Sequence, residues 1–230
     1  MRVKVIVFDL DDTLYNEINY VISGFKAVSS YLSKEFAIDE TRFYEKMIHF
    51  LESQGRGKVF DETLKFFGLY SKTNVKKSIS IYRTHSPKIY LNQDSKKILE
   101  YYFSYNVPLY LVTDGNKIVQ YNKIKALEIE NYFKKIFITH RYGIKHAKPS
   151  PYCFKIIANL EKVHFNEIVY IGDNINKDFI SIKKLGFRTI HLLNGMFKDI
   201  KKSQKYHAEI TISKIQELYD ILQIVRRNHE

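Results

Sequence analysis

This 230-residue sequence has very little cysteine and no long hydrophobic run. Its one cysteine, Cys153, excludes an internal disulfide, and its place beside Phe154 in a predicted helix favours a small buried hydrophobic role over a nucleophile. No apolar run approaches the roughly 18 residues that a membrane-spanning helix needs. The N-terminal run is interrupted by Lys4 and closed by Asp9, unlike a signal peptide. These absences predict a globular, cytoplasmic protein that makes no use of a membrane.

The charge balance is strongly basic, with a formal net charge of +12. A basic surface attracts polyanions such as nucleic acid. The lysines, however, are spread along the chain, and the densest run, from Lys198 to Lys205, has the polar composition of a solvated loop. The sequence therefore argues against nucleic acid as a partner, although a basic field would still attract a small phosphorylated substrate.

Three carboxylates follow directly on the first apolar run. Residues 5–8 read Val-Ile-Val-Phe, and Asp9, Asp11 and Asp12 come within the next four positions. If they are buried together without a cation, like charges lie a few ångströms apart and at least one must take up a proton. A hard divalent cation removes that cost. An Asp-rich turn after a strand is the alternative, and in either case the chain is expected to turn after Leu10.

Two further apolar runs, 107–112 and 167–171, also end in polar residues. A hydroxyl, a carboxylate and a Gly-containing turn follow the first, and their backbone N–H groups suit an anion. Gly-Asp and a later carboxylate follow the second, and a lysine stands between the two runs ahead of a predicted helix. The side chains contributed by these segments are those of Thr113, Asp114, Lys148, Asp173 and Asp178.

Two patterns of apolar residues divide the chain. From about Tyr15 to Pro87 they keep helical spacing without strand-like runs, which predicts about four packed helices. From about Leu91 onward, predicted helices and strands alternate: helices 94–105, 116–128, 150–160 and 176–185, and strands 107–113, 135–139, 167–172 and 187–193.

This alternation predicts a parallel sheet with helices on both faces and the strand 5–9 in its middle. Ligands bind such sheets beyond the carboxyl ends of the strands, where the polar residues described above fall. The tail from Ala208 to Arg227 is expected to form a short edge strand and a closing amphipathic helix.

Together these residues resemble the four motifs of the haloacid dehalogenase superfamily of aspartyl-phosphate-forming phosphohydrolases. The motifs occur in the family's order, as Asp9-x-Asp11-x-Thr13, Thr113, Lys148 and Gly172-Asp173-x-x-x-x-Asp178. The resemblance spans about residues 3–195 and looks most like the branch of sugar-phosphate and nucleotide phosphatases that includes N-acylneuraminate phosphatases.

The resemblance implies an α/β fold with two domains. Residues 1–14 and 88–230 would form a Rossmann-like, doubly wound parallel sheet core, and residues 15–87 a small all-helical cap that sets specificity. It also implies an Mg²⁺-dependent phosphatase that acts on a small phosphorylated metabolite, either a sugar phosphate or a nucleotide.

The resemblance assigns roles in phosphoryl transfer to five residues. Asp9 would attack phosphorus to form an aspartyl phosphate, and Asp11 would serve as general acid and then general base. Thr113, Asp114 and Lys148 would bind the substrate phosphate, with Lys148 neutralising charge shared with Asp9. Asp114 departs from the pattern, because many relatives carry Asn there and a carboxylate near phosphate is repulsive.

The same resemblance implies a metal site. Mg²⁺ prefers oxygen ligands, and Asp9, Asp173 and the backbone carbonyl of Asp11 would supply them. Asp178 would orient these ligands from behind.

Alternatives remain open at this level. The presence of Asp11 favours phosphoryl chemistry over carbon–halogen cleavage, but a phosphosugar mutase would share every motif, and a non-catalytic binding protein with a basic surface would keep the fold. Thr13 suits helix capping or turn support as well as catalysis. In the predicted cap, Arg56 could reach an anionic substrate group, although a flexible polar loop is the simpler interpretation. No spacing among His49, His85 and His140 indicates a zinc site.

Overall fold

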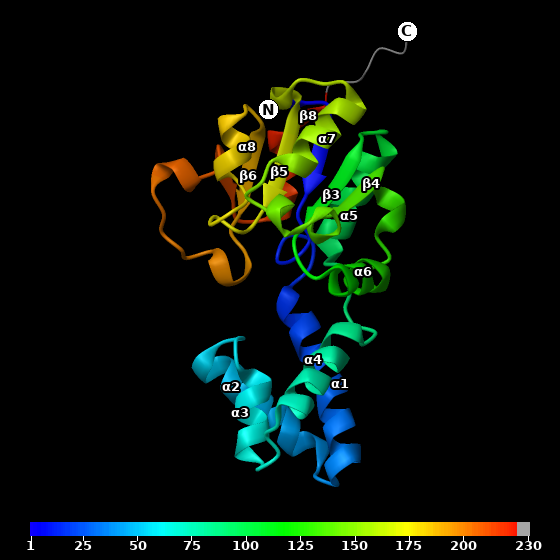
Figure 1. The fold of residues 1–230 in the computed structure, drawn as a ribbon. Helices are drawn as coiled ribbons and strands as arrows, with labels where there is room; N and C mark the ends of the chain where they lie inside the picture. The colour runs from blue at the N-terminus through cyan, green and yellow to red at the C-terminus, as the bar shows by residue number, and fades with distance from the viewer. Residues whose placement is uncertain (225–230) are drawn as a thin grey trace. The chain divides into compact units, whose positions relative to one another are not determined.

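The computed structural model describes residues 1–224, which fall into two compact units (Figure 1). One, here called the core unit, combines Met1–Glu17 with the chain from Tyr90 onward. The other, the helical unit, is Ile18–Ile89. No helix among the described residues has the length and apolar character needed to cross a membrane.

The core unit is built on a six-stranded, wholly parallel sheet with the order β4-β3-β2-β5-β6-β7. Its strands are β2 (Val5–Phe8), β3 (Leu109–Thr113), β4 (Lys135–Ile138), β5 (Ile168–Gly172), β6 (Arg188–Leu192) and β7 (Ile210–Ile212). Every residue of β2, β3 and β5 is buried, as expected for parallel strands covered on both faces. The predicted α/β parallel-sheet fold, with the first strand in an interior position, is confirmed.

Helices flank this sheet (Figure 1). They are α5 (Gln93–Ser104), α6 (Lys117–Ala126), α7 (Tyr152–Glu161), α8 (Ile180–Lys184) and α9 (Leu218–Ile221). Side chains of α7 and α8 pack on the sheet face that presents Val5 and Val7, and Cys153 is buried in that cluster, as the sequence predicts. Short 3-10 helices occur at Glu130–Tyr132, Thr139–Tyr142, Ile144–His146, Phe165–Glu167, Gly195–Phe197, Gln204–Tyr206 and Ile215–Glu217.

Two predicted helices are wrong in extent. The helix expected over 176–185 begins only at Ile180, because the Asp178 carboxylate accepts the backbone N–H of Asn174 and closes a loop there. The closing helix expected before Arg227 is reduced to the four residues of α9. The chain then forms β8 (Gln223–Ile224), which pairs in parallel with β1 (Arg2–Val3), and Arg227 itself lies outside the described residues.

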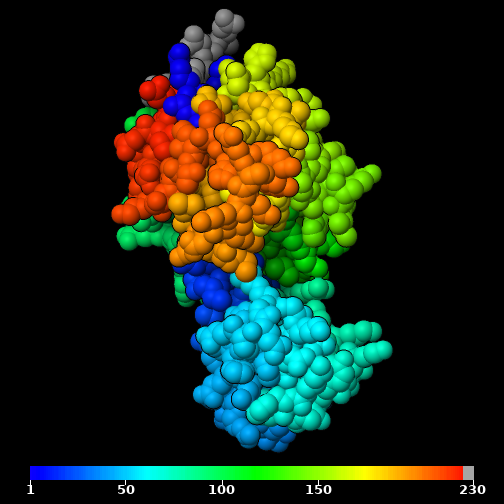
Figure 2. Space-filling view, turned by 90° about the vertical axis from the view of Figure 1, so that its left-hand side faces the viewer, coloured from blue at the N-terminus to red at the C-terminus, as the bar shows by residue number. Residues whose placement is uncertain are grey.

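The segment between β6 and β7 carries the lysine-rich run and lies on the surface of the core unit (orange in Figure 2). All four of its lysines, from Lys198 to Lys205, are exposed. The interpretation of this run as a solvated loop is therefore confirmed.

The helical unit contains the expected four helices: α1 (Glu17–Phe36), α2 (Glu40–Gln54), α3 (Val59–Phe66) and α4 (Lys72–Thr84). Asp39 and Ser71 cap α2 and α4 by accepting backbone N–H bonds from the first turn. The unit has its own apolar core, composed of Val21, Phe25, Val28, Leu32, Phe43, Met47, Val59 and Leu64. Arg56 lies exposed in the loop between α2 and α3.

Candidate active site

The predicted site residues lie at the carboxyl ends of three adjacent strands. Asp9 follows β2, Thr113 ends β3, and Asp173 follows β5. The chain turns after Leu10 as expected, because the N–H of Leu14 donates to the Leu10 carbonyl at 3.0 Å. Parallel pairing thus brings together residues that are more than a hundred positions apart in the sequence.

The turn that follows Asp9 is tight. Asp12 adopts a left-handed backbone conformation with φ of 53°, and its carboxylate accepts the N–H of Glu17 at 2.9 Å. Thr13 is buried in this turn, and its hydroxyl has no hydrogen-bond partner among residues 1–224, so it caps no helix here.

Three carboxylates form a buried cluster. Asp9, Asp173 and Asp178 each offer an oxygen, and these oxygens lie within 4.8 Å of one another. Burial raises the pKa of Asp9 to about 7, although Lys148 opposes the rise. Burial, together with the charges of Asp9 and Asp178, raises the pKa of Asp173 to about 9. The cluster therefore carries more negative charge than its protein surroundings stabilise.

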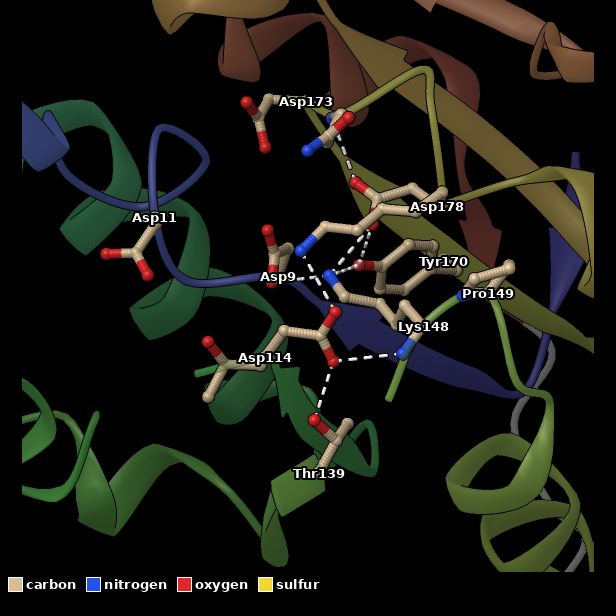
Figure 3. A network of polar contacts seen from close by, with 12 residues as sticks. Asp9, Asp11, Asp114, Thr139, Lys148, Pro149, Tyr170, Asp173 and Asp178 are labelled. Atoms are coloured by element: carbon tan, nitrogen blue, oxygen red, sulfur yellow. Dashed lines mark hydrogen bonds and ion pairs between the residues drawn. The ribbon is translucent and has the colours of Figure 1, made fainter. Parts of the chain in front are cut away.

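Lys148 contacts two carboxylates of this cluster (Figure 3). Its ammonium lies 2.9 Å from Asp9, 2.8 Å from Asp178 and 2.8 Å from the Tyr170 hydroxyl, which also donates to Asp178 at 3.2 Å. Burial alone would lower the pKa of Lys148, but Asp178 and Asp9 hold it well above its ordinary value. A permanently charged ammonium is thus fixed against Asp9.

Gly172 has a packing role in this cluster. A Cβ atom at this position would lie 2.4 Å from Oδ2 of Asp178. Only glycine lets the end of β5 pass so close to that carboxylate. The Gly-Asp pair of the fourth motif is therefore explained by the room that Asp178 needs.

Asp114 is fully engaged with protein groups. Oδ1 accepts the Thr139 hydroxyl at 2.6 Å and the Lys148 N–H at 3.0 Å, and Oδ2 lies 2.9 Å from the Lys177 ammonium (Figure 3). Burial would raise the pKa of Asp114, but Lys148 and Lys177 keep it below the ordinary value. The negative charge of Asp114 is therefore compensated by protein groups. That Asp114 takes part in binding the substrate phosphate stays a prediction.

Asp11 and Thr113 belong to a second polar network. Lys123 lies 2.7 Å from Oδ1 of Asp11, and the Gln120 amide donates both to Oδ2 of Asp11 at 2.8 Å and to the Thr113 hydroxyl at 2.6 Å. Tyr15 donates to Oδ1 at 2.6 Å. Burial would raise the pKa of Asp11, but Lys123 and these hydrogen bonds hold it below the ordinary value.

The structure thus sorts the predicted residues into two groups. Asp9, Lys148, Asp173 and Asp178 are in mutual contact or lie within one cluster, whereas the side chain of Asp11 turns to the second network and is not a member of the cluster. Among the described residues, the groups that could hold a metal include no histidine.

Sequence reasoning missed several polar residues of the two networks. They are Tyr15, Glu17, Gln120, Lys123, Thr139, Tyr170 and Lys177. A signal existed for Gln120 and Lys123, whose spacing places them with Ile124 on one face of a predicted helix. Tyr170 gave none, because a tyrosine in an apolar strand is usually a core residue.

Comparisons with known proteins give the site its context. The family model described as haloacid dehalogenase-like hydrolase matches residues 6–192. A glyceraldehyde 3-phosphate phosphatase from Methanocaldococcus jannaschii is 30% identical over 98% of this chain and 100% of its own length. A protein of the same name from Pyrococcus furiosus is 27% identical over 96% of this chain and 94% of its own length.

The fold has close counterparts among solved structures. The HAD-hydrolase YfnB from Bacillus subtilis superposes with a TM-score of 0.67 at 18% identity, over 96% of this chain and 99% of that one. The resemblance to the phosphatase branch of this superfamily, with a Rossmann-like core and a helical cap, is confirmed. The relatives named here are glyceraldehyde 3-phosphate phosphatases rather than N-acylneuraminate phosphatases.

Proposed function

Because this chain belongs to the haloacid dehalogenase-like hydrolase family, we propose that it is an Mg²⁺-dependent phosphomonoesterase that forms an aspartyl phosphate on Asp9. The observation that carries this proposal is the buried trio of Asp9, Asp173 and Asp178 with the Lys148 ammonium against it. An uncompensated buried carboxylate cluster beside a fixed cation suits a site for a metal ion and a phosphoryl group.

The donor set fits a hard divalent cation. All three groups are carboxylates, which are the ligands that Mg²⁺ prefers, and burial keeps the pKa values of Asp9 and Asp173 high, at about 7 and about 9. Asp9 and Asp173 would hold the ion, and Asp178 would orient them. When bound, Mg²⁺ supplies positive charge that stabilises the ionised carboxylates and the phosphoryl oxygens.

In the first step, an oxygen of Asp9 attacks phosphorus and the bond from phosphorus to the leaving oxygen breaks. Lys148, 2.9 Å from Asp9, neutralises charge shared by the carboxylate and the phosphoryl group. Asp11, in its protonated form, gives a proton to the leaving oxygen; this form is the minor one near neutral pH, because Lys123 and the hydrogen bonds to Asp11 hold its pKa below the ordinary value. The Thr113 hydroxyl binds a non-bridging oxygen.

In the second step, water attacks the same phosphorus and gives its proton to Asp11. The bond between phosphorus and Asp9 then breaks, which releases inorganic phosphate and restores both carboxyl groups. A phosphosugar mutase would instead protect the aspartyl phosphate from water until a product hydroxyl attacks it, and the product would then be an isomer of the substrate.

The substrate class we propose is a small sugar phosphate, with glyceraldehyde 3-phosphate as the first candidate. The support is the name shared by the two relatives, which align over nearly the whole of this chain. A nucleotide stays the alternative within the same chemistry. We propose that residues 15–87 act as the cap domain that selects among these substrates, with residues 1–14 and 88–230 as the catalytic core.

Phosphate release from a panel of compounds tests the proposal. The panel contains glyceraldehyde 3-phosphate, other sugar phosphates, nucleotides and 4-nitrophenyl phosphate, each with and without Mg²⁺. Asp9→Asn should abolish release, since it removes the nucleophile, while the exposed loop residue Asp199 changed to Asn serves as the matched control and should stay active. Acid-quenched mass spectrometry should find a phosphoryl group on the peptide that contains Asp9.

The outcomes separate the candidates. Release that needs both Mg²⁺ and Asp9 supports the phosphatase, and the ranking of compounds gives the substrate class. An isomerised sugar phosphate without free phosphate would favour the mutase. Turnover of no compound, together with salt-sensitive binding of generic DNA, would favour a binding protein.

A further inference from the structure

Helix α6 buries two polar side chains on the face that it turns toward the core. Gln120 is 1% exposed and Lys123 is 2% exposed. Residues three apart lie on the same side of a helix, and the buried side of a surface helix is normally apolar. Burying an ammonium is unfavourable unless its partners compensate for the lost hydration. The partners of Lys123 therefore indicate why it is there.

Lys123 joins two carboxylates of the first motif region. Its ammonium lies 2.7 Å from Asp11 and 3.2 Å from Glu17. These carboxylates are only 20% and 22% exposed, so solvent screens the pairs weakly. The pair with Asp11 is the shorter, and it concerns the residue proposed to move protons.

Gln120 completes the arrangement. Both N–H groups of its amide are used, one on Oδ2 of Asp11 at 2.8 Å and one on the Thr113 hydroxyl at 2.6 Å. Because Lys123 and Tyr15 donate to Oδ1, both oxygens of Asp11 are held. A carboxylate bound at both oxygens cannot rotate freely about its last bond, so its direction is fixed by α6 together with Tyr15.

We infer that Lys123, with Gln120, is a positioning residue for Asp11 in phosphoryl transfer. Neither side chain is assigned to the substrate or to Asp9; each acts by fixing the direction of Asp11, and Gln120 sets that direction relative to the phosphate-binding hydroxyl of Thr113. The inference rests on the proposed function and deepens it. Lys148 then contacts the proposed nucleophile, Asp9, and Lys123 contacts the proposed proton donor, Asp11.

Leaving-group chemistry distinguishes positioning of an acid from a structural role. An alkoxide leaves poorly unless it receives a proton, whereas 4-nitrophenoxide leaves readily without one. A displaced Asp11 should therefore slow cleavage of an alkyl phosphate much more than cleavage of an aryl phosphate. General misfolding would reduce both by the same factor.

The experiment measures kcat/KM for glyceraldehyde 3-phosphate, or the best alkyl phosphate of the panel, and for 4-nitrophenyl phosphate. Lys123→Gln removes the ammonium, and Gln120→Met removes the two amide bonds without leaving a charge unpaired. Lys125→Gln is the matched control, because Lys125 lies on the same helix with an exposed side chain paired to Glu130. Thermal unfolding of each variant checks that it is folded.

Lys123→Gln should lower kcat/KM for the alkyl phosphate about 100-fold, the lower end of the usual effect of general acid catalysis. For the aryl phosphate, the loss should be less than about tenfold. Because a displaced Asp11 also activates water poorly, 4-nitrophenol should appear in a burst of about one equivalent followed by slow turnover. Gln120→Met should show the same selectivity with a smaller loss, and Lys125→Gln should match the unchanged protein.

Equal losses for the two substrates in both variants, or no loss in either, would overturn the inference while leaving the phosphatase intact. If Lys123→Gln does not fold, Gln120→Met alone decides between selective and equal losses. An unchanged protein that hydrolyses neither compound would overturn the proposed function, and the inference with it.

Discussion

Asp173→Asn should make the metal-free protein more stable rather than less. This carboxyl lies in a buried cluster with Asp9 and Asp178, where burial and its neighbours raise its pKa to about 9. The folded state thus keeps a proton on Asp173 at pH 7, whereas the unfolded state, with the ordinary value of 3.8, has released it. Holding that proton across about three pH units costs roughly 4 kcal/mol of folding stability.

Asparagine has nearly the same shape and takes no charge, so the substitution removes this cost. Its buried amide would offer two N–H donors to a site that the structure fills with carboxylates, and any donor left unpaired costs about 1–3 kcal/mol. The difference predicts a gain of about 2 kcal/mol at pH 7 without metal. The gain should disappear and become a small loss as the pH falls toward 4, because the unfolded carboxyl then also holds its proton and only the cost of the unpaired amide donor remains.

Urea unfolding in the presence of a chelator measures the gain, and repetition with excess Mg²⁺ measures the linkage to metal. A ligand that binds only the folded state stabilises it in proportion to the logarithm of its concentration. The unchanged protein should therefore become more stable with Mg²⁺ and the Asp173→Asn variant should respond much less. Asp199→Asn, at an exposed position, controls for the loss of one charge.

The reasoning is refuted if the variant is less stable than the unchanged protein in chelator at pH 7. It is also refuted if the stability difference does not change between pH 4 and pH 8.

Two further predictions concern the surroundings of Lys148. Tyr170→Phe removes a buried hydroxyl that accepts from this ammonium at 2.8 Å, so urea unfolding should show a loss of about 1.5–3 kcal/mol, as for hydrogen bonds to charged groups; an unchanged midpoint would contradict it. Gly172→Ala places a Cβ 2.4 Å from the Asp178 carboxylate, so the strand end must shift, at a cost of about 1–3 kcal/mol and with lower phosphatase activity. A stable and fully active alanine variant would contradict this prediction, because it would show that the Asp178 side chain can move aside without loss of stability or activity.

The sheet could be predicted because its strands are short apolar runs that end in functional residues. Val5 to Phe8 has no polar residue, and the carboxylates after it can share a site only if the neighbouring strands run parallel. Pairing of β2 with both β3 and β5 follows from the same logic. The cluster of Asp9, Asp173 and Asp178 could be predicted from the sequence for that reason.

The second network could not be predicted with the same ease, because lysines and glutamines on helices are usually solvated. The burial of Lys123 can be recognised only when its helix is placed, since burial depends on which face of the helix turns toward the loop after β2. The predicted extents of α8 and α9 were wrong for a related reason. A side-chain bond from Asp178 to the backbone replaces helical bonds before Ile180, and pairing of β8 with β1 takes residues from the tail.

The whole chain has a positive net charge, whereas the candidate active site has a negative one. The chain carries a formal charge of +12. The two networks, by contrast, gather six carboxyl groups against three ammonium groups, from Asp9, Asp11, Glu17, Asp114, Asp173 and Asp178 against Lys123, Lys148 and Lys177. The formal excess is three negative charges, and the proton that Asp173 keeps at pH 7 without metal reduces it to two.

A phosphorylated compound is therefore drawn toward the protein from a distance and repelled over the last few ångströms. In kinetic terms, the proposed function then implies an ordered sequence, in which a divalent cation enters first and the phosphate ester follows.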